Sequence, residues 1–205
     1  MAVSAVNGLA KVLLLALYPL ALSAAATEEA QAACSAISDQ FSEKVASDGI
    51  SWDLDLNADY FEARTEYWSL ANADVKPACV FLPESAQEVA YAVKVLNNYT
   101  SVPWAVKGGG HNPNVGFSST DGGVLIAMQN MANTTLDDNN LAHVGAGARW
   151  GEAQQQLDPH GRAIVGGRIG EVGVAGYTLG GGLSFLSGEY VCSPDLCMVQ
   201  RLTIN

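Results

Sequence analysis

Two glycine-rich runs constrain the fold of this chain more than any other feature of its sequence. The first run, Lys107–Asn112, reads Lys-Gly-Gly-Gly-His-Asn and directly follows a short apolar segment. The second run, Val172–Gly182, ends in three consecutive glycines. Because glycine lacks a Cβ, each run can take positive φ and bring backbone N–H groups close to a bulky anion.

The first run has two interpretations. Lys107 adds a positive charge and His111 adds a nucleophilic ring nitrogen, which together predict a phosphate-binding loop with an attached nucleophile. Alternatively, the run is a turn between two strands that is followed by an ordinary histidine. The second glycine-rich run favours the phosphate-binding loop. The first run is not a dinucleotide fingerprint, because Pro113 stands where the third glycine of G-x-G-x-x-G would be, and it has no Walker lysine pattern.

Length and charge limit the possible partners. The chain has 205 residues, enough for one domain or one large lobe. Charged residues make up only 15% of the sequence, and the net charge is −11. A nucleic acid or an anionic membrane is therefore not expected as a partner, since both bind basic patches.

The N-terminal residues have the pattern of a secretory signal peptide. Lys11 precedes the apolar stretch Val12–Leu22, and Ala24–Ala26 provide small residues at a cleavage site. The stretch is too short to span a bilayer comfortably. We therefore expect residues 1–26 to be a cleaved signal peptide and the protein to be secreted. The alternative is a buried N-terminal helix.

Four cysteines fit the oxidising compartment that a secreted protein enters. Cys34 and Cys79 are the pair that we expect to form a disulfide. No metal site is expected, because the chain has neither C-x-x-C spacing nor paired histidines. Two acceptor sequences for glycosylation, at Asn98 and Asn133, are usable in a secreted protein.

Hydrophobic periodicity predicts a βαβ unit that leads into the first glycine-rich run. Residues 78–82 form the first expected strand, a capping box at Ser85–Glu88 begins a helix, and residues 102–106 form the second strand. This short crossover makes the two strands parallel. The glycine run then follows the carboxyl end of a parallel strand, where α/β sheets commonly bind ligands.

Further elements are expected on either side of this unit. Residues 28–46 form an amphipathic helix, and residues 51–74 form a mixed, aromatic segment. After the βαβ unit, we expect buried strands over residues 123–127 and 141–147, a helix over 150–157 and a short strand over 163–165.

Four sequence blocks occur in an order that resembles one group of flavoproteins. The blocks are Lys107–His111, Gly122–Ile126, Gly145–Ala148 and Val172–Phe185. With these blocks the chain resembles FAD-linked oxidases of the berberine-bridge-enzyme-like, vanillyl-alcohol-oxidase type, and among them the secreted fungal oxidases. The resemblance extends from about Trp68 to Tyr190 and does not specify a substrate.

The resemblance implies the fold class and the domain boundaries. It implies an α+β or α/β PCMH-type FAD-binding domain over residues 75–190, built from two α/β subdomains with FAD between them. Residues 27–74 then form a helical and aromatic lead-in. Relatives continue into a substrate domain, so we expect the domain to be truncated and incomplete at its C-terminus. Residues 191–205 depart from the family pattern, as a shifted reading frame or a retained intron would produce.

The resemblance also implies how the cofactor is held. In the family, the histidine of the first run, here His111, forms a covalent 8α-histidyl link to FAD. Many relatives have a second link from a cysteine at the position of Ile169, so we expect a single link. The other residues expected to bind the cofactor are Lys107, Gly108, Gly109, Gly110, Asn112, Gly116, Gly173, Val174, Gly176, Tyr177, Gly180, Gly181 and Gly182. Alternatively, the second run packs tightly without a ligand.

The activity that the resemblance implies is an FAD-dependent oxidation. A small organic substrate would transfer a hydride to FAD, and O₂ would reoxidise the cofactor and give H₂O₂. No catalytic base is identifiable in the sequence. Two other interpretations remain: a truncated, inactive secreted fragment that binds FAD weakly or not at all, and a secreted glycine-rich binding domain without a nucleotide.

Overall fold

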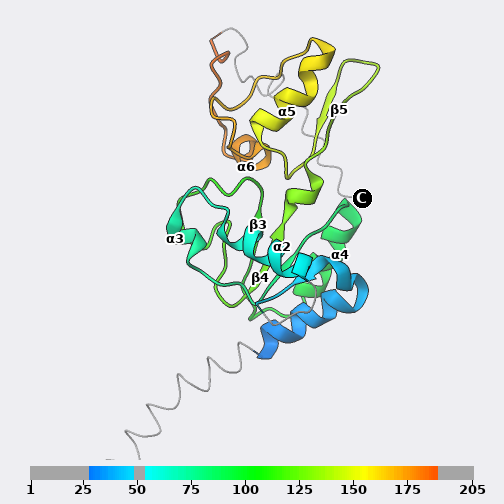
Figure 1. Ribbon diagram of the computed structural model, residues 1–205, viewed down its shortest axis with the longest axis vertical. Helices are drawn as coiled ribbons and strands as arrows, with labels where there is room; N and C mark the ends of the chain where they lie inside the picture. Colours follow the sequence, from blue (N-terminus) through cyan, green and yellow to red (C-terminus); the bar gives the residue numbers. More distant parts are fainter. Residues whose placement is uncertain (1–27, 49–53, 189–205) are drawn as a thin grey trace, which may run out of the picture.

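The computed structural model describes residues 28–48 and 54–188, which form two parts (Figure 1). The first part contains a four-stranded sheet with helices on both faces. The second part, at the top of the view, contains a β-hairpin together with helices α5 and α6. This mixed α/β architecture agrees with the fold class expected from the sequence.

The sheet contains four short strands in the order β1-β2-β4-β3. They are β1 (Val45–Ala46), β2 (Cys79–Phe81), β3 (Trp104–Lys107) and β4 (Val124–Ala127). Strands β2, β4 and β3 are parallel, whereas β1 pairs antiparallel with β2 at one edge. The parallel orientation predicted for β2 and β3 is confirmed, and β4 is inserted between them.

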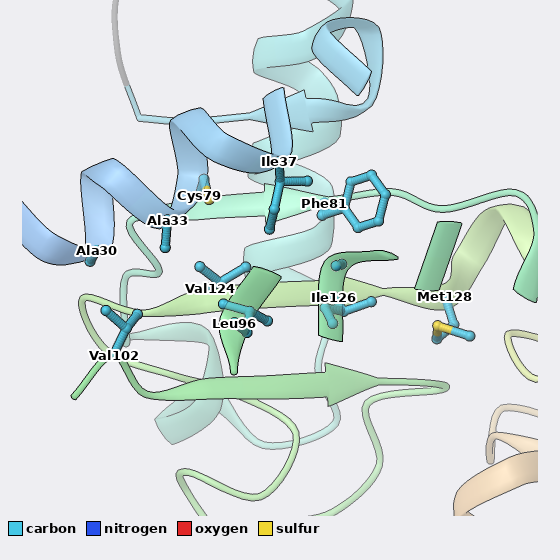
Figure 2. Close-up of a cluster of buried hydrophobic side chains, with 11 residues drawn as sticks. Ala30, Ala33, Ile37, Cys79, Phe81, Leu96, Val102, Val124, Ile126 and Met128 are labelled. Atoms are coloured by element: carbon cyan, nitrogen blue, oxygen red, sulfur yellow. The ribbon is translucent and has the colours of Figure 1, made fainter. Parts of the chain in front are cut away.

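Strand β4 is apolar throughout because helices cover both faces of the sheet. Val124 and Ile126 belong to a core that includes the helix over residues 28–41, and Figure 2 shows side chains of that helix pointing onto strands β2 and β4. Leu125 belongs to the core on the opposite face, together with residues of α2 (Leu54–Thr65). The buried strand predicted at this position is confirmed.

The N-terminal helix is shorter than the sequence predicts. It covers residues 28–41 instead of 28–46, and the 3-10 turn η1 (Ser42–Lys44) follows it. Val45–Ala46 leave the helix because they pair with β2 as the edge strand β1. Apolar spacing continued through these residues, but it did not distinguish a last helical turn from a strand that pairs with a distant segment.

A disulfide attaches this helix to the sheet. Cys34 on the helix is bonded to Cys79 on β2, with a Cα–Cα distance of 6.0 Å and a sequence separation of 45 residues. Cys79 is fully buried in the core. The predicted pairing is therefore the one found in the structure.

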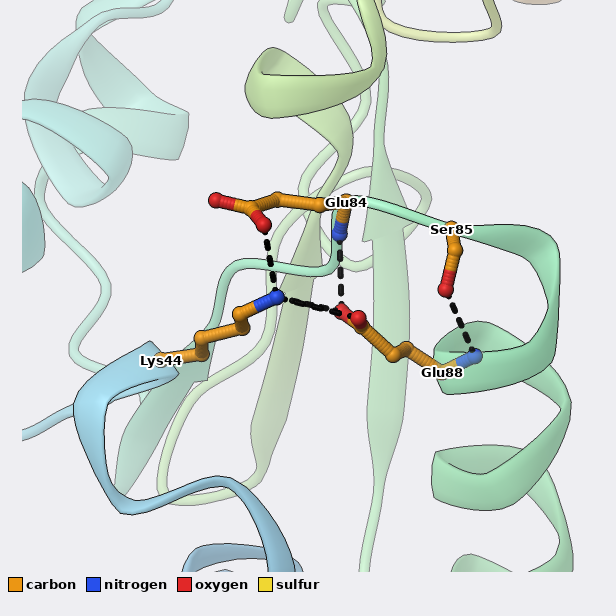
Figure 3. A network of polar contacts seen from close by, with 4 residues as sticks. All are labelled: Lys44, Glu84, Ser85 and Glu88. Carbon is orange, nitrogen blue, oxygen red and sulfur yellow. Dashed lines mark hydrogen bonds and ion pairs between the residues drawn. The ribbon is translucent and has the colours of Figure 1, made fainter.

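A polar network fastens the start of α4 (Ala86–Leu96) to the turn before β1 (Figure 3). Ser85 caps the helix by accepting a hydrogen bond from the Glu88 N–H at 3.3 Å. The Glu88 carboxylate accepts from the Glu84 N–H at 2.9 Å and pairs with the Lys44 amine at 3.0 Å. The predicted cap by Ser85 is confirmed. The Glu88 carboxylate accepts from the N–H of the residue before the cap, and not from the N–H of Ser85 itself, and it also pairs with Lys44.

The hairpin of the second part consists of β5 (Thr134–Leu136) and β6 (Ala142–Val144). Asp137 holds its turn by accepting from the Leu141 N–H at 2.8 Å, and this hydrogen bond keeps the pKa of Asp137 below its usual range. The strand predicted over residues 141–147 is present as β6, but its predicted length and burial are wrong. The strand is shorter and partly exposed, because it pairs only with β5.

The remaining helices are short and surround the hairpin or the glycine-rich runs. They are α3 (Leu70–Ala73), η2 (Met128–Met131), α5 (Trp150–Leu157), η3 (Asp158–His160) and α6 (Val174–Leu179). The helix predicted over 150–157 is confirmed. The strand predicted over 163–165 is wrong: the Ile164 N–H donates to the Gln154 side chain of α5 at 3.3 Å, so this segment follows a helix instead of joining a sheet.

Two expectations fall on residues outside the described ranges, namely the signal peptide over residues 1–26 and the atypical tail over residues 191–205. Among the helices that the structure describes, none has both the length and the apolarity to span a bilayer.

Candidate functional site

The first glycine-rich run begins where strand β3 ends, at the carboxyl edge of the parallel strands. Lys107 is the last residue of β3 and pairs with Ala127 of β4. Gly108, Gly109 and Gly110 carry the chain away from the sheet, and His111 follows them. The βαβ prediction placed the run at this edge, where parallel sheets commonly bind ligands.

The two glycine-rich runs meet at Gly109 and Gly173. A Cβ on Gly109 would lie 2.4 Å from the Gly173 nitrogen, and a Cβ on Gly173 would lie 2.4 Å from the Gly109 nitrogen. Neither position has room for a side chain, since both obstacles are backbone atoms. Gly173 also forms an isolated antiparallel bridge with Arg149. The glycine contact therefore joins the two parts of the molecule.

Gly110 turns the chain toward His111 in the left-handed conformation, with φ of 67°. Its carbonyl accepts a hydrogen bond from the Trp68 N–H at 3.1 Å. The backbone N–H groups of Gly109, Gly110 and His111 meet no acceptor among the residues that the structure describes. Unpaired N–H donors in a glycine-rich bend suit an anionic group.

Lys107, which the sequence suggested as a positive charge for a phosphate-binding loop, is buried behind the run. The residue is 3% exposed, and its Nζ donates to the Ala63 carbonyl at 2.7 Å and lies 4.3 Å from the centre of the Tyr67 ring. Burial lowers the pKa of this amine to about 8, although Glu66 raises it in part and Arg149 lowers it further. The amine thus holds the run against α2, and its expected contact with a phosphate stays a prediction.

His111 lies in a pocket of about 240 Å³ between the two parts of the molecule. The lining residues are Glu66, Tyr67, Trp68, Gly109, His111, Arg149 and Glu171. The imidazole of His111 stacks on the Trp68 indole, with ring centres 5.3 Å apart and planes inclined by 26°. Arg149 Nη2 pairs with Glu66 Oε2 at 3.0 Å and so connects the two parts beside the histidine.

A buried amide fixes the loop that follows the first run. Asn72 is fully buried, its Nδ2 donates to the Asn112 carbonyl at 3.0 Å, and its Oδ1 accepts from Ser119 Oγ at 2.6 Å. Ser119 Oγ in turn accepts from the Gly116 N–H at 3.1 Å. Asn112 and Gly116 are therefore exposed residues of a fixed loop, and they do not line the pocket.

Most of the second run forms helix α6 and the turn after it, beyond the pocket. Tyr177 meets the Trp150 ring edge-on, with centroids 5.0 Å apart, and a Cβ on Gly182 would lie 2.2 Å from the Tyr177 ring. The indole N–H of Trp150 is buried and meets no hydrogen-bond partner within the described part of the chain. The other expected cofactor residues of this run that lie outside the pocket lining are Gly173, Val174, Gly176, Gly180 and Gly181.

Of the cofactor residues expected from the sequence, the pocket lining includes Gly109 and His111. The lining residues that the sequence did not identify as site residues are Glu66, Tyr67, Trp68, Arg149 and Glu171. Two adjacent aromatic residues, Tyr67 and Trp68, precede β2 in the sequence and could have drawn attention to this segment. Their spacing alone does not distinguish a binding site from ordinary packing. The arginine carried no local signal, because a long-range backbone bridge brings it to the pocket.

Comparison with known proteins gives one family. The family model described as FAD binding domain matches residues 77–202, which starts near the expected domain start and passes its expected end at 190. An uncharacterized FAD-linked oxidoreductase of Arthroderma benhamiae is 40% identical over 148 residues, which cover 72% of this chain and 30% of the relative. An FAD-dependent monooxygenase of Fusarium proliferatum is 41% identical over 135 residues, covering 65% and 26%. The chain thus spans less than a third of the length of these relatives.

Solved structures of oxidases share the fold. The 6-hydroxy-D-nicotine oxidase of Arthrobacter nicotinovorans superposes with a TM-score of 0.61 at 28% identity, over 72% of this chain and 30% of that one. The glucooligosaccharide oxidase of Acremonium strictum, which is described with a 6-S-cysteinyl, 8α-N1-histidyl FAD, gives a TM-score of 0.54 at 32% identity, over 68% and 28%.

Proposed function

The chain belongs to the FAD binding domain family, and from that membership we propose that it holds FAD by a single covalent bond to His111, as the cofactor-binding part of an FAD-linked oxidase. The observation that carries this proposal is the position of His111. Its imidazole follows a glycine run with unpaired N–H groups and is stacked on Trp68 in a pocket of about 240 Å³. A nucleophilic nitrogen beside backbone donors suits a bond to a nucleotide cofactor.

Backbone donors and two cations near the pocket can meet the diphosphate of FAD, and the lining also carries the carboxylates of Glu66 and Glu171. The unpaired N–H groups of Gly109, Gly110 and His111 can donate to phosphate oxygens. Arg149 adds a guanidinium to the pocket lining. The buried amine of Lys107 keeps most of its positive charge below pH of about 8 and so adds to the positive potential next to the run.

The proposed link joins a ring nitrogen of His111 to the C8 methyl carbon of the isoalloxazine ring. His111 would give up its ring N–H proton and the methyl carbon would give up one proton when the N–C bond forms. Dioxygen would take up both protons and the two electrons released, as one molecule of hydrogen peroxide. Dioxygen is therefore the oxidant that the linkage requires.

A single link is proposed because Ile169 stands where a second attachment would need a thiol. The glucooligosaccharide oxidase of Acremonium strictum is described with both a cysteinyl and a histidyl attachment. The side chain of Ile169 is 55% exposed and has no nucleophilic atom. His111 alone would then carry the cofactor.

For the whole protein we propose oxidation of a small organic substrate. FAD, when bound, accepts a hydride from the substrate and passes the electrons to dioxygen to give hydrogen peroxide. This chain spans only 30% of its Arthroderma relative, so the part of the reaction that we assign to its residues is to bind and orient the cofactor. The Fusarium relative is named a monooxygenase. The alternative outcome for the whole protein is therefore that an oxygen atom from dioxygen enters the product and hydrogen peroxide is not released.

The rival proposal is that residues 1–205 alone bind FAD weakly and turn over no substrate. Three large apolar side chains in and after α6 are highly exposed: Leu179 at 75%, Leu183 at 66% and Phe185 at 80%. Exposed apolar surface of this kind promotes aggregation unless another segment or molecule covers it.

We further propose that the protein is exported. The disulfide between Cys34 and Cys79 is a bond that persists in oxidising compartments. Asn98 and Asn133 are both exposed, so each acceptor sequence is accessible to a glycosyltransferase. An exported protein that loses mass on enzymatic deglycosylation is the expected result.

The test of the proposed function is whether flavin stays with the denatured protein. The full chain is expressed in a secreting host, denatured and separated on a gel, where flavin fluorescence should stay with the polypeptide. His111→Ala should lose this fluorescence, whereas His143→Ala, at a hairpin residue outside the pocket lining, should keep it. Release of all flavin from the unaltered protein would refute the link. Peroxide formed with candidate alcohols and sugars tests the oxidase, and little bound flavin together with no peroxide supports the rival proposal.

A further inference from the structure

Trp68 covers His111 although it is itself largely exposed. Its side chain is 63% exposed, so burial does not hold the indole in place. The indole and imidazole planes are nevertheless inclined by only 26°, with centroids 5.3 Å apart. This is the offset stacked arrangement that aromatic rings prefer over a face-to-face sandwich.

Contacts of Trp68 and of the residue before it fasten this segment to the glycine run and to the loop that follows the run. The Trp68 N–H donates to the Gly110 carbonyl at 3.1 Å, directly before the histidine. The preceding residue, Tyr67, donates its hydroxyl to the Ser118 carbonyl at 2.5 Å, and its ring lies 4.3 Å from the Lys107 amine. These contacts hold the Trp68 backbone in place beside the loop that carries His111. The position of the indole over the imidazole therefore follows from the backbone.

We infer that Trp68 is a positioning residue for His111: its indole restricts rotation of the imidazole and holds the ring in the pocket in the orientation from which the flavin bond forms. This inference rests on the proposed link between His111 and FAD. Without the stack the imidazole samples other rotamers, and the reactive orientation becomes rarer. Loss of one aromatic stack should lower the population of the reactive imidazole orientation about fivefold.

The first experiment tests the restraint without flavin. The full chain is prepared flavin-free from a riboflavin-starved host and treated with diethyl pyrocarbonate, which acylates imidazoles. Peptide mass spectrometry gives the rate at His111 relative to His143 and His160. We expect Trp68→Ala to raise this relative rate about fivefold and Trp68→Phe, which keeps a ring, to leave it near that of the unaltered chain. Leu70→Ala, at an 80% exposed neighbour outside the pocket lining, should change nothing.

The second experiment measures how fast the same preparations acquire denaturation-resistant flavin after addition of FAD in air. Trp68→Ala should link flavin about fivefold more slowly, and Trp68→Phe should restore the rate. If Trp68→Ala does not fold, Trp68→Leu, which keeps apolar volume without a ring, replaces it. An unaltered chain that never links flavin overturns the proposed function and this role together. The positioning role alone is overturned if the unaltered chain links flavin no faster than Trp68→Ala or Trp68→Leu. It is also overturned if His111 is acylated at the same rate in the unaltered chain and in that variant.

Discussion

Gly109 and Gly173 lie so close together that a Cβ on either residue would be 2.4 Å from the backbone nitrogen of the other. The contact joins the end of β3 to the start of α6, and therefore one part of the molecule to the other. The two glycine-rich runs thus have a structural role beside the binding role that their sequence suggests. They close the molecule at the pocket and leave N–H groups next to His111 that meet no acceptor in the described part of the chain.

Replacing Gly109 should destabilise the protein. Because the obstacles are backbone atoms, we expect Gly109→Ala to lower the free energy of unfolding by roughly 3 kcal/mol or more. Gly176→Ala is the matched control, since a Cβ there meets nothing within 4 Å and the residue lies in α6. Alanine in a helix should leave stability unchanged or raise it by up to about 1 kcal/mol. Urea unfolding measures both variants, and equal stabilities would contradict the backbone contact.

Removal of the disulfide should destabilise the first part of the molecule. The bond between Cys34 and Cys79 closes a loop with a sequence separation of 45 residues. Closing a loop of this length lowers the entropy of the unfolded chain and so stabilises the folded protein by about 4 kcal/mol. We expect the double variant Cys34→Ala/Cys79→Ala to lose stability of this order in urea unfolding. Non-reducing peptide mapping of the exported protein should recover the two cysteines in one linked peptide pair, and a free thiol at either position would contradict the bond.

Lys107 should make stability depend on pH in an identifiable window. Its folded-state pKa is lowered to about 8 by burial, from an ordinary value of 10.5. Between these values the unfolded chain still binds a proton that the folded chain has released, so the free energy of unfolding rises with pH. From pH 7 to 9.5 this contributes roughly 2 kcal/mol.

The control for this window is Lys107→Met, which cannot titrate. Urea unfolding across the window should show the rise in the unaltered chain and a smaller slope in the variant. Tyr60, whose pKa burial raises to about 12, contributes in the opposite direction, but only where tyrosine ionises in the unfolded chain, near and above pH of about 10. Parallel pH profiles for the two proteins would show that the amine is not held in a buried environment.

Arg149 should contribute to cofactor binding, although the sequence did not identify it. It is the guanidinium that lines the pocket, and it is paired with Glu66 at 3.0 Å. In a His111→Ala background, where binding is reversible, we expect Arg149→Gln to weaken FAD binding about tenfold, as loss of a charged hydrogen bond does. Arg162→Gln is the control, since that side chain contacts Asn140 near the hairpin turn. Equal FAD affinities in fluorescence titrations would remove Arg149 from the site.

The sequence predicted those parts of the fold that depend on local patterns. The βαβ unit follows from the pattern of apolar residues and from a helix cap, and the apolar strand over 123–127 and the helix over 150–157 were likewise predicted from local sequence. The wrong predictions depend on distant partners. Val45–Ala46 became a strand because β2 offers an open edge, and residues 163–165 did not, because a helix side chain binds their backbone instead.

The candidate site divides in the same way. His111 and its glycines were identifiable because they form a continuous motif in the sequence. The burial of Lys107 was not identifiable, since it depends on α2 reaching back over the end of β3 to offer the Ala63 carbonyl. Nor was the pairing of Arg149 with Glu66, which joins residues that are 83 positions apart.

The single bond between His111 and FAD is the central claim, and peptide mass spectrometry of the exported protein tests it most directly. The protein is denatured, digested and searched for peptides that carry the mass of FAD or of its flavin mononucleotide part. We predict one such peptide, with the modification on His111, and none in the His111→Ala variant. A flavin carried on Cys192 or Cys197, or an unmodified His111 peptide from a preparation that contained stoichiometric FAD before denaturation, would contradict the account.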